Sequence, residues 1–112
     1  MLVALVWVGS RASVAGPLTL TQEGSPRATI VQASRPVRAA QFAALELQYH
    51  LRLMTGVEIP IVREPDAGQG IRILVGESEA TKSLGLTKES FASQEYLIRF
   101  LPQTLVLMGR DK

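Results

Sequence analysis

Residues 36–56 carry the longest periodic pattern of hydrophobic and polar positions in the chain. Apolar residues recur there at spacings of three and four, which predicts an α-helix with a single apolar stripe. The stripe consists of Ala40, Ala43, Ala44, Leu47, Leu51 and Met54, whereas Arg38, Gln41, Gln48 and Arg52 fall on the other side. Pro36 has a fixed φ that suits a first helical turn, and Gly56 supplies the left-handed residue that often ends a helix. We expect the rest of the domain to pack around this helix.

Short runs rich in β-branched and aliphatic residues predict strands on both sides of the helix. They cover residues 28–33, 57–62, 71–75, 95–100 and 104–108. The first two enclose the helix in a strand–helix–strand unit, and residues 101–103 join the last two as a hairpin. Pro60 cannot donate a ladder hydrogen bond, so we expect its strand to lie at a sheet edge or to have Pro60 facing out of the pairing.

A short helix over residues 77–84, ended by Gly85, completes the pattern. The predicted fold class is α/β (α+β), with a small mixed sheet of about five strands on which one long helix and one short helix pack. Several strands are apolar on both faces: if Ile73 and Val75 face the long helix, Leu74 points the opposite way. Such strands are normally covered on both sides. Since one long and one short helix cannot cover both faces of such a sheet, we expect a bare second face and association of the chain.

The N-terminal residues 2–8, LVALVWV, form an apolar run that is too short to span a bilayer. Ser13 and Ala15 follow it with the small side chains that a signal-peptide cleavage site needs. We interpret residues 1–15 as a signal peptide and expect a secreted or periplasmic protein without a stable membrane span. The alternative is a first β-strand, because Val3, Leu5 and Trp7 alternate along the run.

Residues 16–27 mix Gly, Pro, Ser and Thr with little periodicity, which is typical of a linker. Leu18 and Leu20 could extend a short edge strand there. With this division, residues 28–112 form the globular domain.

Composition excludes several classes of function. The 112 residues include no Cys, so disulfide frameworks, zinc ribbons and thiol nucleophiles are ruled out. The 12 basic and 10 acidic residues are spread evenly, and their formal net charge of +2 does not gather into a basic patch. We therefore expect no nucleic-acid partner.

The chain offers few candidates for catalysis or metal binding. His50, the single histidine, follows Glu46 by four residues, and the helix therefore lacks the two-histidine zinc motif. Glu77 and Glu79 could be the paired carboxylates of a glycosidase, but such a pair must flank a bond across roughly 5–9.5 Å. Two acids at a helix start point apart, and the helix dipole explains them. Gly76 lacks the second Gly and the Lys of a phosphate loop. We predict no catalytic, metal-binding or cofactor-binding residue, and no cofactor.

Carbohydrate-binding modules stack sugar rings on exposed aromatic side chains. The aromatic residues after the predicted signal peptide are Phe42, Tyr49, Phe91, Tyr96 and Phe100. Tyr96 and Phe100 alternate with Ile98 on one face of a strand, which is most simply a core face. A carbohydrate-binding module is therefore an alternative that exposed aromatic residues would favour.

Six segments, in the order in which they follow one another, carry a family resemblance: ATIVQA, AALELQYHLRLMTGVEIPIV, IRILVGES, LGL, EYLIRF and TLVLMGRD. They resemble the domain that precedes the catalytic barrel in α-glucuronidases. A related domain precedes the barrel of β-N-acetylhexosaminidases and occurs in multidomain bacterial proteins of unknown function. The resemblance covers residues 28–111, and its most specific parts are ELQ and MTG of the helix, PIV, and the VGxS turn at residues 75–78.

The resemblance implies a small α/β domain that accompanies a glycoside hydrolase barrel and contributes no catalytic carboxylate. In the family the chain continues after the Gly-Arg-Asp turn into another helix and the barrel, whereas this sequence stops at Lys112. We therefore expect a C-terminally truncated domain whose partner in cis, the catalytic barrel, is missing. The expected function is that of a non-catalytic accessory domain of a hydrolase in polysaccharide metabolism. The alternatives are a carbohydrate-binding module and a free-standing protein-interaction domain.

Overall fold

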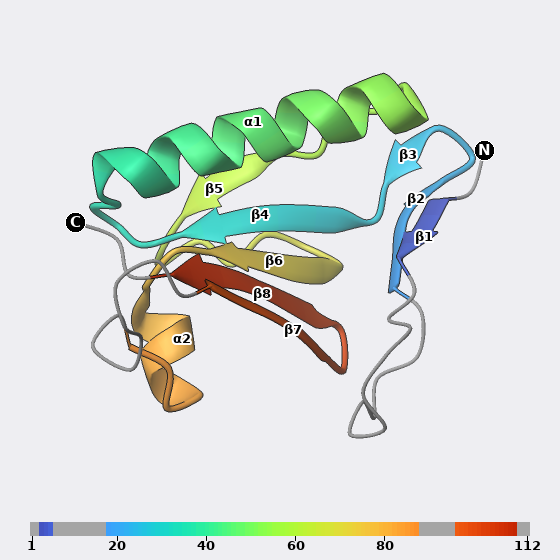
Figure 1. Ribbon diagram of the computed structural model, residues 1–112. Helices are drawn as coiled ribbons and strands as arrows, with labels where there is room; N and C mark the ends of the chain where they lie inside the picture. The colour runs from blue at the N-terminus through green and yellow to red at the C-terminus, as the bar shows by residue number, and fades with distance from the viewer. Residues whose placement is uncertain (1–2, 6–17, 88–95, 110–112) are drawn as a thin grey trace.

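A five-stranded mixed β-sheet forms the centre of the molecule, with one helix on each face (Figure 1). The structure is a computed structural model that describes residues 3–5, 18–87 and 96–109. Its elements are β1 (Val3–Leu5), β2 (Leu18–Gln22), β3 (Ser25–Pro26), β4 (Ala28–Gln32), α1 (Arg38–Thr55), β5 (Ile61–Arg63), β6 (Ile71–Val75), α2 (Glu79–Ser83), β7 (Tyr96–Leu101) and β8 (Thr104–Gly109). The predicted fold class is confirmed for these residues.

The strand order of the central sheet is β5-β4-β6-β8-β7. β5, β4, β6 and β8 run parallel to one another, and β7 pairs with β8 in the predicted antiparallel hairpin. The predicted unit of strand, helix and strand is β4–α1–β5. β5 lies at the sheet edge, as predicted, but it begins at Ile61 and not at residue 57, so that Pro60 precedes the strand. The Pro60 carbonyl accepts a hydrogen bond of 2.8 Å from the Ile30 N–H.

Helix α1 lies over β4 and β6 and ends as the sequence predicts. Gly56 has φ +75° and donates its N–H to the Arg52 carbonyl at 2.8 Å, which closes the last turn. The beginning differs from the prediction, because Val37 is the N-cap residue and Pro36 precedes the helix. The buried residues of α1 are Ala40, Ala44, Leu51 and Thr55, and Leu47 packs against the same core.

Two positions of the predicted stripe were wrong. Met54 is 61% exposed and Ala43 is also exposed, because the face of α1 that meets the sheet is narrower than the run of apolar residues suggested. Leu47 is half-buried at the margin of this face. The small side chains of Ala40 and Ala44, both buried, bring the helix backbone close to the strands below.

The second face of the sheet is covered in the structure, which corrects the expectation that it would be bare. Leu74 and Val106 point to this face and have no exposed surface. They belong to a cluster with Val31, Leu86 and Met108, against which Ala80 of α2 packs. The short helix and the turn that follows it therefore cover more of the sheet than their length indicates. The predicted reason for self-association does not hold.

Residues 18–26 lie in the predicted linker but form β2 and β3 of a second, smaller sheet with β1. Leu20 is fully buried and belongs to the core cluster on the α1 side, together with Ala28 and Ile30. Residues 3–5 pair with β2, in agreement with the alternative considered for the N-terminal run. Export and cleavage of residues 1–15 stay predictions, and the proposed cleavage site at residues 13–15 lies outside the described residues.

Candidate functional site

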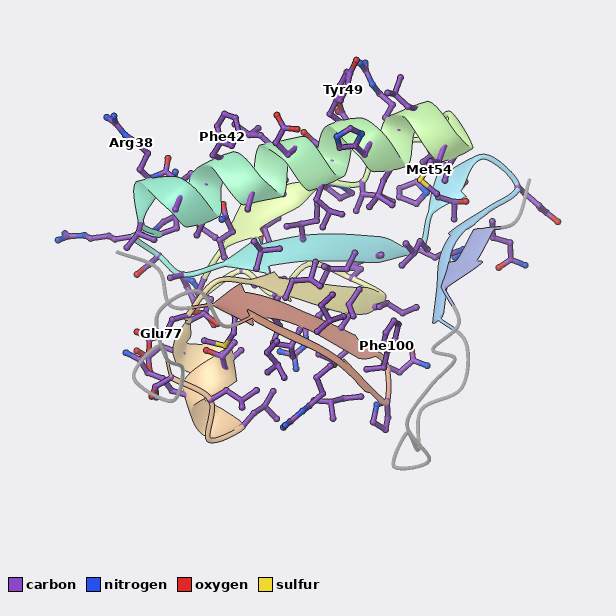
Figure 2. The ribbon with its side chains drawn as sticks, in the orientation of Figure 1. Arg38, Phe42, Tyr49, Met54, Glu77 and Phe100 are labelled. Atoms are coloured by element: carbon purple, nitrogen blue, oxygen red, sulfur yellow. The ribbon has the colours of Figure 1, made fainter. Side chains whose placement is uncertain are left out.

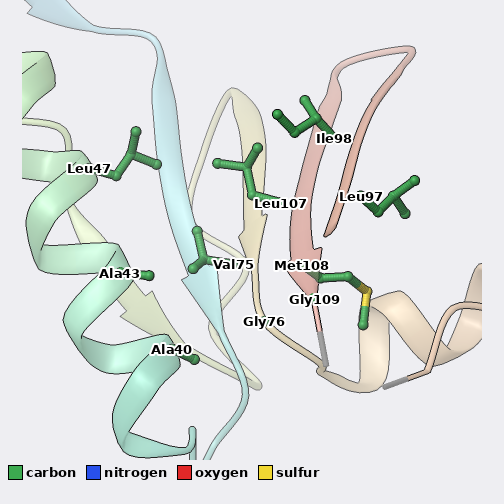
Figure 3. A pocket seen from close by; sticks show the side chains of 10 residues that line it. All are labelled: Ala40, Ala43, Leu47, Val75, Gly76, Leu97, Ile98, Leu107, Met108 and Gly109. Atoms are coloured by element: carbon green, nitrogen blue, oxygen red, sulfur yellow. The ribbon is translucent and has the colours of Figure 1, made fainter. Parts of the chain in front are cut away.

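An apolar groove lies beside helix α1 (Figure 3). It has a volume of about 310 Å³ and runs between α1 and the carboxyl ends of β6 and β8. We call it the α1–β8 groove. Its lining is formed by Ala40, Ala43, Leu47, Val75, Gly76, Leu97, Ile98, Leu107, Met108 and Gly109. No residue in this lining has a charged or hydrogen-bonding side chain, so the groove suits an apolar surface better than a sugar or an ion.

The groove exists because α1 covers only part of its face of the sheet. The helix packs on β4 and β6, whereas β8 and β7 lie beyond its edge. Ile98 and Leu107 are opposite one another in the β7–β8 register and form the floor of the groove. Ile98 is consequently 56% exposed although it points to the same side of the sheet as the core residue Leu105.

A second apolar surface lies on the outer side of α1, which points away from the sheet. Phe42, Leu45, Tyr49 and Leu53 are spaced by three and four residues and are 64%, 58%, 50% and 62% exposed. We call these four residues the outer stripe. Figure 2 shows Phe42 and Tyr49 projecting from the outer side of the helix. The Arg52 guanidinium lies 5.9 Å from the centre of the Tyr49 ring and borders the stripe with a positive charge.

The outer stripe was not predicted from the sequence, because the pattern of α1 was interpreted as a single apolar face. The signal was present, since Phe42, Leu45, Tyr49 and Leu53 have the same spacing as the residues of the buried face. A helix with two opposite apolar faces suits an element that is covered on both sides.

The candidate catalytic residues Glu77 and Glu79 line a different, polar crevice of about 230 Å³. It lies where β4 leads into α1 and β6 leads into α2, and Glu64 also lines it. Carboxyl ends of strands that lead to helices on opposite faces are a common place for ligands in α/β sheets. Both acids line this crevice, and the expectation that their side chains point apart stays a prediction.

The best-defined role in this crevice belongs to Glu64, which sequence analysis did not single out. Its two carboxylate oxygens accept hydrogen bonds from the backbone N–H groups of Glu79 (2.9 Å) and Ala80 (3.0 Å). The carboxylate thereby caps the N-terminus of α2, where the helix dipole favours a negative charge. Glu79 is exposed and its carboxylate lies 3.6 Å from the Lys82 ammonium. The hydrogen bonds of Glu64 therefore have a structural role at the N-terminus of α2.

His50 lies on the surface of α1, with its side chain 62% exposed. Its Nε2 atom is 3.4 Å from a carboxylate oxygen of Glu46, one helical turn earlier. Among the described residues, no group of three or more His, Cys, Asp or Glu side chains could hold a metal ion. Within the same ranges, no helix has the length and apolar character that a bilayer span requires.

Comparisons of the chain with models of protein families, with curated proteins and with solved structures gave no match.

Proposed function

We propose that this chain is a non-catalytic accessory domain of an α-glucuronidase-like glycoside hydrolase, with a place in polysaccharide metabolism. In this proposal the domain contacts another protein surface through the α1–β8 groove, and a catalytic barrel carries out the hydrolysis. The proposal includes export of the protein, as the N-terminal apolar run suggests, and no nucleic-acid partner.

The observation that carries the proposal is the apolar lining of the α1–β8 groove. Sugar hydroxyl groups need hydrogen-bond partners, and a site without polar side chains leaves them unsatisfied. An apolar protein surface, by contrast, gains free energy from contact with Leu47, Ile98 and Leu107 in such a groove. The groove is therefore better suited to a protein neighbour than to a substrate.

The acidic residues of the polar crevice also support a non-catalytic role. Glycoside hydrolysis needs one carboxylic acid and one carboxylate that flank the scissile bond. Of the three acids in the crevice, Glu64 uses both of its oxygens to cap α2 and Glu79 lies beside Lys82 on an exposed helix turn. Neither is held in the way that a general acid or a nucleophile requires.

A hydrolysis assay tests the proposal. The purified chain, incubated with aryl glucuronides and aryl N-acetylhexosaminides, should release no aryl alcohol above the rate in buffer. Glu77→Gln and Glu79→Gln variants are the matched controls. Turnover that is present in the original chain and lost in either variant would refute the non-catalytic assignment and identify the polar crevice as an active site.

A carbohydrate-binding module is the second candidate, and the exposed rings of Phe42 and Tyr49 favour it specifically. They lie two turns apart on the outer stripe, where both could stack on sugar rings of one glycan chain. Retardation on immobilised xylan that disappears in Phe42→Ala and Tyr49→Ala, but persists in Leu45→Ala, would support this candidate. We expect no retardation, because the Arg52 guanidinium already lies near the Tyr49 ring.

A further inference from the structure

Two apolar surfaces on the same side of the central sheet lack a partner in the described structure: the outer stripe of α1 and the α1–β8 groove beside it. We infer that a second copy of this chain covers both, in a closed dimer in which α1 of each copy lies in the groove of the other. This inference rests on the proposed function in one respect, that the groove is a protein-docking surface.

The strip of sheet beyond the edge of α1 is about as wide as one helix. β8 and β7, the strands beyond the edge of α1, are together about 10 Å wide at the usual strand spacing. A helix with its side chains is also about 10–12 Å across. The outer stripe runs from Phe42 to Leu53, about 17 Å along the helix axis. The six-residue strands β7 and β8 extend about 20 Å.

A dimer with a two-fold axis parallel to α1 covers both apolar surfaces of each copy. The outer stripe lies opposite the face of α1 that contacts its own sheet, because its residues are half a turn away from Ala44 and Leu51. Rotation about the axis places the outer stripe of the second copy on Ile98 and Leu107 of the first. The outer stripe of the first copy lies on the same two residues of the second. The result is a layer of two parallel helices between two sheets, a closed arrangement in which each surface is used once.

The side of α1 that borders the groove permits such close packing. Ala43 is exposed there and has a methyl side chain, so that two helices can approach at about 8–10 Å. Leu47 and Met54 lie on the same side, one and three turns further along. Glu46 and His50, three and seven residues after Ala43, lie on this side as well, and each Glu46 carboxylate lies 3.4 Å from the His50 Nε2 atom of its own copy.

The area is sufficient for a specific contact. Phe42, Leu45, Tyr49, Leu53 and Ile98 are each at least half exposed, which corresponds to roughly 100 Å² of apolar side chain apiece. Two copies would bury about 1,000 Å² in total from these residues alone, which is the area at which specific but weak interfaces begin. An area of this size indicates a reversible dimer whose population depends on concentration.

Sedimentation equilibrium of the full chain over a concentration series is the first test. We expect a monomer of 12.2 kDa at low concentration and a limiting mass twice as large at high concentration. Leu45→Glu on the outer stripe and Ile98→Glu in the groove should each weaken the dimer at least about tenfold, because each places a charge in an apolar contact. Leu84→Glu is the matched control, since Leu84 is 43% exposed on neither surface and should leave the dimer unchanged.

The absence of Cys from the chain allows a second test of the geometry. Ala43 should meet Ala43 of the other copy across the axis, so Ala43→Cys should form an intermolecular disulfide under mild oxidation. Glu58→Cys, at an exposed site beyond the helix, should not. Circular dichroism melts of all variants establish that they are folded, as expected for changes at exposed positions.

A monomer at all concentrations would overturn the inference, as would a series of masses beyond the dimer. Dissociation by Leu45→Glu but not by Ile98→Glu would also overturn it, because it would mean that the stripes contact one another and leave the groove empty. These results do not bear on hydrolysis, and turnover of aryl glycosides would refute the proposed function without changing the oligomeric state.

Discussion

The side-chain amide of Gln48 holds the backbone that leaves helix α1. Its Nε2 atom donates a hydrogen bond of 2.8 Å to the carbonyl of Ile59, a residue with no exposed surface. Ile59 anchors the extended segment between α1 and β5 in the core on the α1 side. The bond therefore connects the flank of the helix to the strand that follows it.

Gln48→Ala should destabilise the protein by about 1–2 kcal/mol, since it leaves the Ile59 carbonyl without this donor in a partly buried place. Urea denaturation followed by circular dichroism measures the change in the free energy of unfolding. Gln69→Ala, at an exposed loop position, is the control and should change that free energy by less than about 0.5 kcal/mol. Equal midpoints for Gln48→Ala and the original chain would show that the bond contributes nothing.

The role of Gln48 could not be predicted from the pattern of the helix. Periodicity places the side chain outside the apolar stripe, which is correct, and a polar residue in that place is usually solvated. The Ile59 carbonyl that it contacts belongs to a segment whose path depends on tertiary structure. The same reasoning explains why Glu64 was missed, because its partners, the N–H groups of Glu79 and Ala80, are 15 and 16 residues away.

At the scale of elements, α2 is a helix of five residues whose beginning is unusually well bonded. Ser78 and Thr81 form a capping box, in which each side-chain oxygen accepts a hydrogen bond from the other residue's backbone N–H. The Glu64 carboxylate accepts hydrogen bonds from the two N–H groups between them, those of Glu79 and Ala80. An isolated helix of this length would not form in water, so these bonds and the burial of Thr81 hold it in place.

Ser78→Ala should cost about 1 kcal/mol, the usual loss for a helix cap, because the Thr81 N–H loses its side-chain acceptor. Thermal melting detects the loss as a lower Tm. Ser83→Ala at the other end of α2 is the comparison, since its hydroxyl donates to the Glu79 carbonyl on an exposed surface and should matter little. A larger loss in Ser83→Ala than in Ser78→Ala would contradict the importance of the capping box.

The elements themselves were largely predictable. Gly56 marked the end of α1, Pro60 marked the edge strand, and the apolar runs gave β4, β6, β7 and β8 within two residues of their bounds. Their faces were harder to predict, because Phe42, Leu45 and Leu53 are as hydrophobic as the residues that α1 buries. Hydrophobicity shows that a helix has two apolar faces, but only packing shows which one the domain itself covers.

At the scale of the whole molecule, the structure differs from the prediction made from the sequence in where apolar surface is exposed. The pattern of β6 and β8 is apolar on both faces, and both faces are in fact covered at Leu74 and Val106. Most of the exposed large hydrophobic side chains among the described residues lie instead on the α1 side, at the outer stripe, Met54 and Ile98, and Leu84 at the end of α2 is 43% exposed. The proposed docking surface depends on this distribution.

Thiol labelling of single-cysteine variants tests this distribution most directly, because the chain has no Cys of its own. Leu45→Cys and Ile98→Cys, labelled at a concentration low enough to keep the chain monomeric, should react within about tenfold of their rates in urea. Val106→Cys should react at least about 100-fold more slowly in the folded chain than in urea, because reaction requires local opening. If Val106→Cys reacts as fast as Ile98→Cys in the folded chain, the second face is open and the account is wrong.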